Sequence, residues 1–374
     1  MNSNRPLRIE NPHRNHKFWH KVQVHCHSRE SDAKRGQTPK AVEEAYRDAG
    51  YDCVFLTDHN RVTPSPGVPG VLHIDSSEHG IGRHHTLALG ISHEASDQHY
   101  PDDPEAGSLF CNENEDGIRA AVGCACRNIP KRLAHIATVQ RAIPVVAHPN
   151  ARHFCTRVIC PRFCGGGWSP RDLLDHARHY AGLEIFNANN AARRMWGLDR
   201  WDEVLASVPW GIWGFASDDC HDIHDESTFD RGFIMVNSDI DPVRCRHGQV
   251  DRDTWRQDML ENIRSGNFCA VVRLQERRHR GHLPPPSQDS GPSLVVSCSQ
   301  GQIHVAADRP CETVEFCAGS SSHRESAPAS GSADFVYDVG DWEESVRVRL
   351  IQKRDAGQHY MVFSQPLFVR RDEP

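Results

Sequence analysis

The sequence predicts an α/β domain followed by a small all-β domain. In the first part, short apolar runs alternate with amphipathic helical stretches, which is typical of parallel strands joined by helices. After three consecutive prolines at 284–286, short alternating runs separated by turn residues are typical of an antiparallel sandwich. We therefore expect an N-terminal extension over 1–19, an α/β domain over 20–275, a linker over 276–292 and a C-terminal β-sandwich over 293–374.

The first strand of the α/β domain is expected at VQVHCH, where apolar Val22 and Val24 alternate with polar neighbours. A strand turns every second side chain to the same face, so the imidazoles of His25 and His27 should point the same way. Asp32 follows on the next loop and adds a carboxylate. Imidazole and carboxylate groups at this spacing suit a divalent transition metal.

A helix and a second strand follow and complete a βαβ unit. Thr38 is placed to cap the helix, Pro39 suits its first position, and Gly50 marks its end. The next run, CVFL, is apolar at every position, as expected for a parallel strand that is buried on both faces. This strand leads into Asp58 and His59, so polar side chains again follow the end of a strand.

Acidic and histidine side chains accompany the next apolar runs in the same way. Glu78 follows one apolar stretch, and His84 and His85 precede the run at 87–91. His148 follows the run IPVVA. Among these side chains, the carboxylate of Glu78 is the type that can bridge two cations.

The last two strands of this domain are expected at GLEIFN and WGIWGFAS. The first strand follows a helix with Ser169 as its cap and brings Glu184 and Asn187 to its end. The second strand is followed by Asp219 and His221, which are two residues apart like the opening histidines.

These side chains should meet, because the carboxyl ends of strands converge on one mouth in barrels of alternating strands and helices. They supply more nitrogen and oxygen ligands than one cation can use, so we expect two or three divalent ions, Zn, Mn or Fe. The expected metal ligands are His25, His27, Asp32, His59, Glu78, His85, His148, Asp219 and His221.

The composition limits the partners and the location of the protein. The 374 residues carry a net charge of -7 and show no basic stripe, so we expect no nucleic-acid partner. The N-terminus lacks the apolar segment of a secretory signal, and no apolar run is long enough to span a membrane. We therefore expect a cytoplasmic protein that acts on a small molecule, in an oligomeric state that the sequence leaves open.

The motifs HCHSRESD, FLTDHN, VVAHP, LEIFN and SDDCH, with the Glu78 to His85 segment after the second, resemble those of the polymerase and histidinol phosphatase (PHP) superfamily. The resemblance covers about residues 20 to 275, and the C-terminal part is similar to the appended β domain of one subgroup. It implies a distorted (βα)7 TIM-like barrel with a trinuclear metal site, followed by the β-sandwich. Ala33 departs from the family's pattern, which usually has glycine at this position.

The resemblance also implies which residues share each ion. The first ion would be held by His25, His27, Glu78 and Asp219, the second by Glu78, His85 and His148, and the third by Asp32, His59 and His221. His84 could compete with His85, but we prefer His85 because it keeps the family's phase with the strand that follows.

The functional hypothesis is the hydrolysis of a phosphomonoester by a hydroxide that bridges the ions. His59 and His221 are expected to stand near the leaving oxygen of the substrate. Asp58 is expected to orient a histidine that binds a metal.

Three side chains that follow or end strands are candidates for binding the substrate: Arg152, Arg193 and Asn187. A guanidinium can hold a phosphate through two parallel hydrogen bonds. Two alternatives remain open, namely a carboxyl or carbamate esterase that uses the same ions on carbon, and a non-catalytic metal-binding module. An apolar pocket, rather than one lined by arginine, would favour the esterase.

Overall fold

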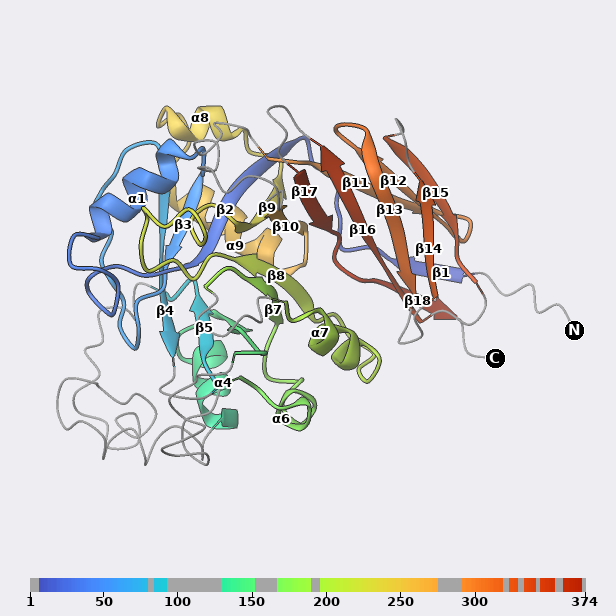
Figure 1. Cartoon of the computed structure of the whole chain (residues 1–374), viewed down its shortest axis with the longest axis horizontal. Coiled ribbons are helices and arrows are strands. Elements are labelled where there is room, and N and C mark those ends of the chain that lie inside the picture. The colour runs from blue at the N-terminus through green and yellow to red at the C-terminus, as the bar shows by residue number, and fades with distance from the viewer. Residues whose placement is uncertain are drawn as a thin grey trace, which may run out of the picture.

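The computed structural model of the chain (Figure 1) describes residues 7–79, 84–92, 129–151, 167–189, 196–274, 291–318, 323–328, 333–340, 344–353 and 359–371. Strands make up most of its regular structure. Fifteen of them form one mixed sheet, and three more form a separate small sheet.

The large sheet follows one hydrogen-bonded path with a short branch. The path is β1 (Leu7–Glu10), β18 (Leu367–Arg371), β16 (Ser345–Lys353), β17 (His359–Phe363), β10 (Phe268–Leu274), β9 (Gly232–Ser238), β2 (Phe18–Cys26), β3 (Cys53–Leu56), β4 (Leu72–His79), β5 (Thr86–Leu89), β6 (Ile143–Val146), β7 (Gly182–Asn187) and β8 (Trp213–Ser217). The branch is β13 (Cys311–Ala318), which pairs with β16 and with β14 (His323–Pro328). The small sheet contains β11 (Leu294–Ser299), β12 (Gln302–Ala307) and β15 (Asp334–Asp338).

Six helices lie within the described residues. They are α1 (Pro39–Asp48), α4 (Ile129–Thr138), α6 (Pro170–Asp175), α7 (Leu198–Leu205), α8 (Pro242–Arg246) and α9 (Arg252–Arg264). None of them is long and apolar enough to cross a membrane.

Two of these helices begin at the caps that the sequence predicts. The side chain of Thr38 accepts a hydrogen bond from the backbone nitrogen of Ala41 at the start of α1. Ser169 accepts one from the backbone nitrogen of Asp172, whose carboxylate accepts one back from the backbone of Ser169. These predictions are confirmed, because capping depends on residues within one turn of the chain.

The prediction of a distorted (βα)7 barrel is wrong. In the described part of the chain, parallel pairing is limited to β2 with β3, β3 with β4, β6 with β7, and β7 with β8. β5 runs antiparallel to both β4 and β6, and β9 runs antiparallel to both β2 and β10. All strands of a TIM-like barrel run parallel, so this mostly antiparallel sheet is a different architecture.

The connection between β4 and β5 shows why the barrel prediction failed. Residues 80–85 alone separate the two strands, whereas a crossover between parallel strands needs a dozen residues or more. The two strands therefore pair antiparallel. The apolar runs form strands as predicted, but six residues are too few for the helical crossover that the barrel implied by the resemblance requires.

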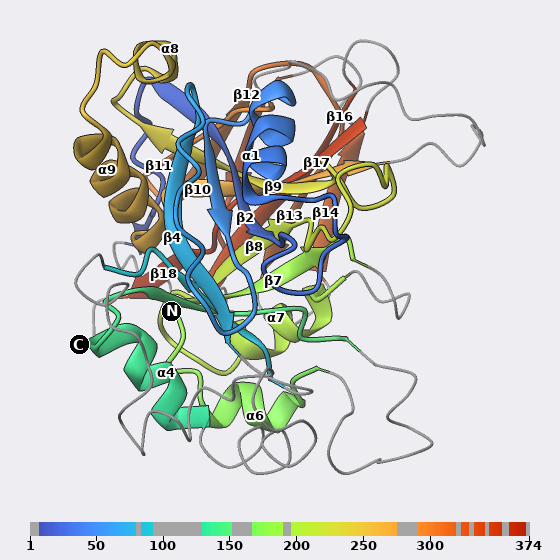
Figure 2. The same cartoon turned by 90° about the vertical axis from the view of Figure 1, so that its left-hand side faces the viewer.

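β3 is buried on both faces, as its apolar sequence predicts. Val54 shares a hydrophobic cluster with Tyr46 of α1, whereas its neighbour Phe55 shares a different cluster with Trp255 of α9. Alternate side chains of a strand point to opposite faces, so the two helices cover opposite faces, and Figure 2 shows them on either side of the central strands. This packing holds the strand whose end leads to His59.

The strands of residues 294–371 pair with a strand of the expected α/β domain and with a strand of the expected N-terminal extension. β17 pairs antiparallel with β10, and β1, in the expected N-terminal extension, pairs with β18. Figure 1 shows the strands of residues 294–371, in orange and red, beside the first part of the sheet. The predicted linker lies outside the described residues except for 291 and 292.

Candidate metal centre

The pair of histidines at the end of β2 forms the base of a buried cluster. His25 lies within β2 and His27 follows directly after it, and both are fully buried. Their Nε2 atoms are 3.2 Å apart. Both rings therefore present a nitrogen to the same point, which is the arrangement that the alternation in the sequence predicts.

Glu78 lies at the centre of the cluster and is 1% exposed. One of its oxygens lies 3.1 Å from Nε2 of His25, 3.2 Å from Nε2 of His27 and 3.4 Å from Nδ1 of His59. The other oxygen lies 2.7 Å from Nδ1 of His85 and 3.0 Å from Nε2 of His148. The carboxylate thus stands between two sets of imidazoles, as a ligand shared by two cations would.

Asp219 brings a second carboxylate to the same point from the loop after β8. Its Oδ1 lies 3.1 Å from Nε2 of His27 and 3.3 Å from Nε2 of His25. Its backbone nitrogen donates to the carbonyl of His25 over 2.8 Å, which fixes the loop against β2. Asp219 and His148 have positive φ angles of 50° and 28°. Residues other than glycine rarely adopt this backbone conformation, and those that do are frequent at functional sites.

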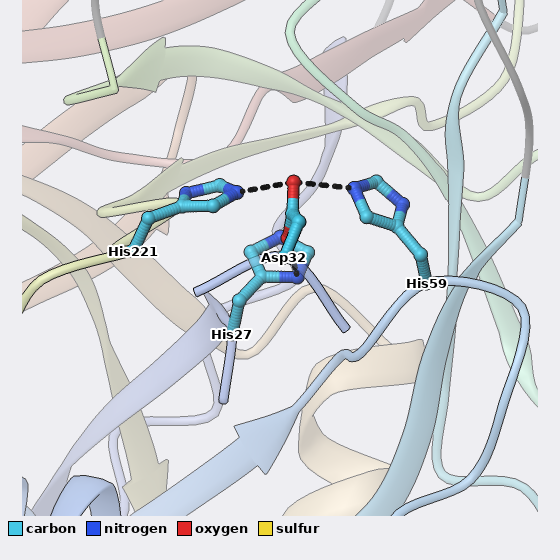
Figure 3. Close-up of side chains that lie close together, drawn as sticks. All are labelled: His27, Asp32, His59 and His221. Atoms are coloured by element: carbon cyan, nitrogen blue, oxygen red, sulfur yellow. Dashed lines mark hydrogen bonds and ion pairs between the residues drawn. The ribbon is translucent and has the colours of Figure 1, made fainter. Parts of the chain in front are cut away.

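A third, more exposed set of side chains surrounds Asp32 (Figure 3). Its carboxylate lies between Nε2 of His221, at 3.1 Å, and Nε2 of His59, at 3.5 Å. The ring of His27 stacks on that of His221 with centroids 4.3 Å apart. The side chain of Asp32 is 49% exposed and that of His221 is 28% exposed, so this set faces the solvent.

Within the described residues, three groups of side chains each bring their ligand atoms within 4.8 Å of one another. The groups are His27 with Asp32, His59 and His221; His25 with His27, Glu78 and Asp219; and His59 with Glu78 and His85. His148 joins them through its contact with Glu78. The nine side chains predicted as ligands therefore form one cluster, and its buried groups could hold a metal ion.

The electrostatics of the cluster fit a cation site. Burial would lower the pKa of His25, but the surrounding carboxylates, Asp219 first, raise it well above its usual value. Burial would raise the pKa of Glu78, yet the histidines, His25 and His85 foremost, hold it well below its usual range. The carboxylates beside His221 raise its pKa to about 9 against the effect of burial. Protons and divalent cations would therefore compete for these imidazoles.

Asp58 supports the loop that carries Asp32. Among the described residues, the hydrogen bonds of its side chain do not reach a histidine of the cluster. It accepts hydrogen bonds from the backbone nitrogen of Ser28 and from the hydroxyls of Ser28, Ser31 and Thr63, at 2.5 to 2.8 Å. The hydroxyl of Ser31 in turn lies 3.4 Å from Nδ1 of His27. The side chain predicted to orient a histidine thus acts through the loop between His27 and Asp32.

Asn187, predicted to bind the substrate, is buried inside the site. Its amide nitrogen donates to Glu184 over 2.8 Å and to Asp219 over 3.3 Å. Arg152 and Arg193, the other predicted substrate contacts, lie outside the described residues. Of the two candidate histidines after β4, His85 reaches Glu78, whereas Nε2 of His84 pairs with Asp172.

Glu184 is a residue of the site that the sequence interpretation did not assign. It lies within β7, is 1% exposed, and accepts a hydrogen bond from Nδ1 of His25 over 2.7 Å. The signal was present in the sequence, because a charged residue interrupts the apolar run LEIF. A buried carboxylate in a strand needs a partner, and the neighbouring histidines supply it.

No protein-family model matches the chain, and no curated protein matches it.

Proposed function

We propose that this protein is a metal-dependent hydrolase and that its substrate is a phosphomonoester. The observation that carries the proposal is the position of Glu78, whose carboxylate belongs to two of the three ligand groups. A carboxylate shared in this way would hold two cations close together, and paired ions are typical of enzymes that cleave phosphate esters. The motif order that resembles the PHP superfamily supports the same reaction.

Two or three ions are part of the proposal, with Zn, Mn or Fe as the candidates. The three ligand groups overlap at His27, His59 and Glu78, and mixed imidazole and carboxylate ligands suit these metals. When bound, such ions supply an activated water near neutral pH and neutralise the charge that develops on the phosphoryl group.

The exposed side of the cluster is where we place the leaving group. His59 and His221 are 14% and 28% exposed, and Asp32 lies between them. A substrate that enters from solvent would meet these side chains before the buried ones. Where an open metal position leaves one of these rings unbound to an ion, its nitrogen would donate a hydrogen bond or a proton to the leaving oxygen, while Asp58 would hold the loop that carries Asp32.

The remaining parts of the proposal rest on the sequence. Arg152 and Arg193 would hold the phosphate, since a guanidinium binds a phosphate through paired hydrogen bonds. Asn187 would keep Asp219 in place through its hydrogen bond to that carboxylate. A cytoplasmic location and a small-molecule substrate are further parts of the proposal, and the net charge of -7 without a basic stripe argues against a nucleic-acid partner.

The test is to strip the purified protein with a chelator, reload it separately with Zn, Mn or Fe(II), and assay each form. The substrates are an aryl phosphomonoester and, in parallel, aryl carboxyl and carbamate esters. We expect hydrolysis of the phosphomonoester by at least one loaded form and none by the stripped protein.

Hydrolysis of only the carboxyl or carbamate esters would replace the phosphatase assignment by the esterase and keep the metal centre. Equal activity of the stripped and loaded proteins would contradict metal dependence. A loaded protein that cleaves neither class would contradict the proposed function.

A further inference from the structure

We propose that Glu184 is a positioning residue that fixes two of the metal ligands and thereby sets the affinity of the buried part of the centre for divalent cations. This inference rests on the metal centre of the proposed function and deepens it. Glu184 does not belong to any of the ligand groups that the described residues form, so its effect must pass through its hydrogen bonds.

The carboxylate of Glu184 makes four hydrogen bonds, two at each oxygen. Oε1 accepts from Nδ1 of His25 over 2.7 Å and from the hydroxyl of Ser217 over 2.5 Å. Oε2 accepts from the backbone nitrogen of His148 over 2.6 Å and from the amide of Asn187 over 2.8 Å. The side chain is fully buried, so water does not take the place of these partners.

The bond to His25 selects the form of the ring that binds a metal. When Nδ1 donates its hydrogen to Glu184, Nε2 keeps its lone pair, and Nε2 is the atom that faces Glu78 and Asp219. A carboxylate in this position also fixes the orientation of the ring and makes it a stronger ligand.

The bond to His148 fixes a backbone that would otherwise be unfavourable. His148 follows β6 with a φ of 28°, a conformation that persists only where its surroundings hold it. Glu184 holds its backbone nitrogen, so the imidazole of His148 stays directed at Glu78. One carboxylate on β7 thus secures ligands that come from β2 and from the end of β6.

The same carboxylate reaches a third ligand indirectly. Asn187 donates to Glu184 and also to Oδ2 of Asp219. Ser217, the last residue of β8, lies two positions before Asp219 and bonds to Glu184 as well. Three ligands, His25, His148 and Asp219, therefore share one anchor. Among the described residues, no hydrogen bond joins Glu184 to Asp32 or to the exposed side of the cluster.

The variant Glu184→Gln tests this role. All four partners of the carboxylate are hydrogen-bond donors. In glutamine an NH₂ group, which cannot accept a hydrogen bond, replaces one oxygen, so two of the four hydrogen bonds would be lost. The binding of Co²⁺ and Zn²⁺ to the metal-free full-length protein is measured by titration, with the visible absorption of Co²⁺ as a second readout. We expect affinity for the buried ions to fall about 10- to 100-fold.

The matched control is Glu43→Gln. Glu43 is also a fully buried carboxylate, and it lies 2.5 Å from Nδ1 of His73, away from the cluster. Its substitution removes a buried glutamate–histidine pair without touching a ligand. We expect the metal affinity of this variant to stay within about twofold of the wild type.

Wild-type affinity in Glu184→Gln, or an equal loss in Glu43→Gln, would overturn the inference while leaving the metal centre standing. If circular dichroism shows that Glu184→Gln does not fold, Ser217→Ala is used in its place, because it removes one hydrogen bond to the same carboxylate. We expect Ser217→Ala to lose metal affinity several-fold, and unchanged affinity would overturn the inference. A wild-type protein that binds neither metal would overturn both this inference and the proposed function, so the two failures are distinguishable.

Discussion

The carboxylate of Glu78 contacts five histidine rings, and its replacement is the sharpest single-residue test of the site. Glu78→Gln keeps the size of the side chain but removes its charge, so two cations would lose their shared anion and repel each other. We expect phosphomonoester hydrolysis to fall by several orders of magnitude, measured as kcat/KM, with an unchanged circular dichroism spectrum. Glu261→Gln, on the exposed surface of α9, is the control and should keep full activity.

A second residue-scale prediction concerns the exposed set around Asp32. Asp32→Asn removes the anion between His59 and His221 but leaves the buried ligands intact. We expect the protein to retain about one ion fewer per chain after dialysis against a weak chelator, as measured by elemental analysis. Loss of all bound metal from this variant would show that the exposed and buried sets do not bind ions independently.

At the residue scale, the order of strand ends and polar side chains, with the resemblance that selects His85 over His84, predicted which nine side chains gather. The prediction holds although the barrel does not, because β2, β3 and β4, and likewise β6, β7 and β8, run parallel and so end at the same edge of the sheet. The roles of Asp58 and Asn187 could not be predicted in the same way. Their partners, such as Ser28 and Asp219, are brought to them by tertiary packing.

At the scale of elements, α1 is tied to β4 by an ionic contact. His73 of β4 lies 2.5 Å from Glu43 of α1 and 3.2 Å from Asp75. Burial would lower the pKa of His73, but the two carboxylates raise it to about 9. The interaction should therefore stabilise the fold fully below pH 6.5, the value of an exposed histidine, and be lost as the pH rises through 9.

We expect the free energy of unfolding of the wild type to fall between pH 6 and pH 10. In His73→Gln the fall over the same range should be smaller by roughly 3 kcal/mol. Urea denaturation of the metal-free proteins at both pH values measures this difference. Parallel pH profiles for the two proteins would contradict the ionic contact.

Local signals predicted the elements well, and the pairing between elements poorly. Thr38 and Ser169 cap their helices because the signal lies within one turn of the chain. The place of β5 in the sheet depends on a partner that is distant in sequence, since it pairs with β6 more than fifty residues later. An apolar run of four residues carries no information about which neighbour it will meet.

At the scale of the whole molecule, the cores of the two parts of the chain are continuous. Tyr46 of α1, Phe233 of β9 and Tyr360 of β17 belong to the same hydrophobic cluster as Val348 of β16. The composition of residues 293–374 predicted antiparallel strands, which the structure has. Their alignment with the earlier strands follows from contacts between residues that are far apart in sequence.

The pairing of β10 with β17, from Ala270 to Leu274, has a consequence for the solubility of shortened forms of the protein. Removing residues 293–374 would leave the N–H and C=O groups along one side of β10 without partners, and an open sheet edge is a template for self-association. We expect the fragment of residues 1–292 to aggregate at concentrations at which the full chain is monodisperse by light scattering. The C-terminal strands therefore protect the edge of β10 from pairing with a strand of another molecule.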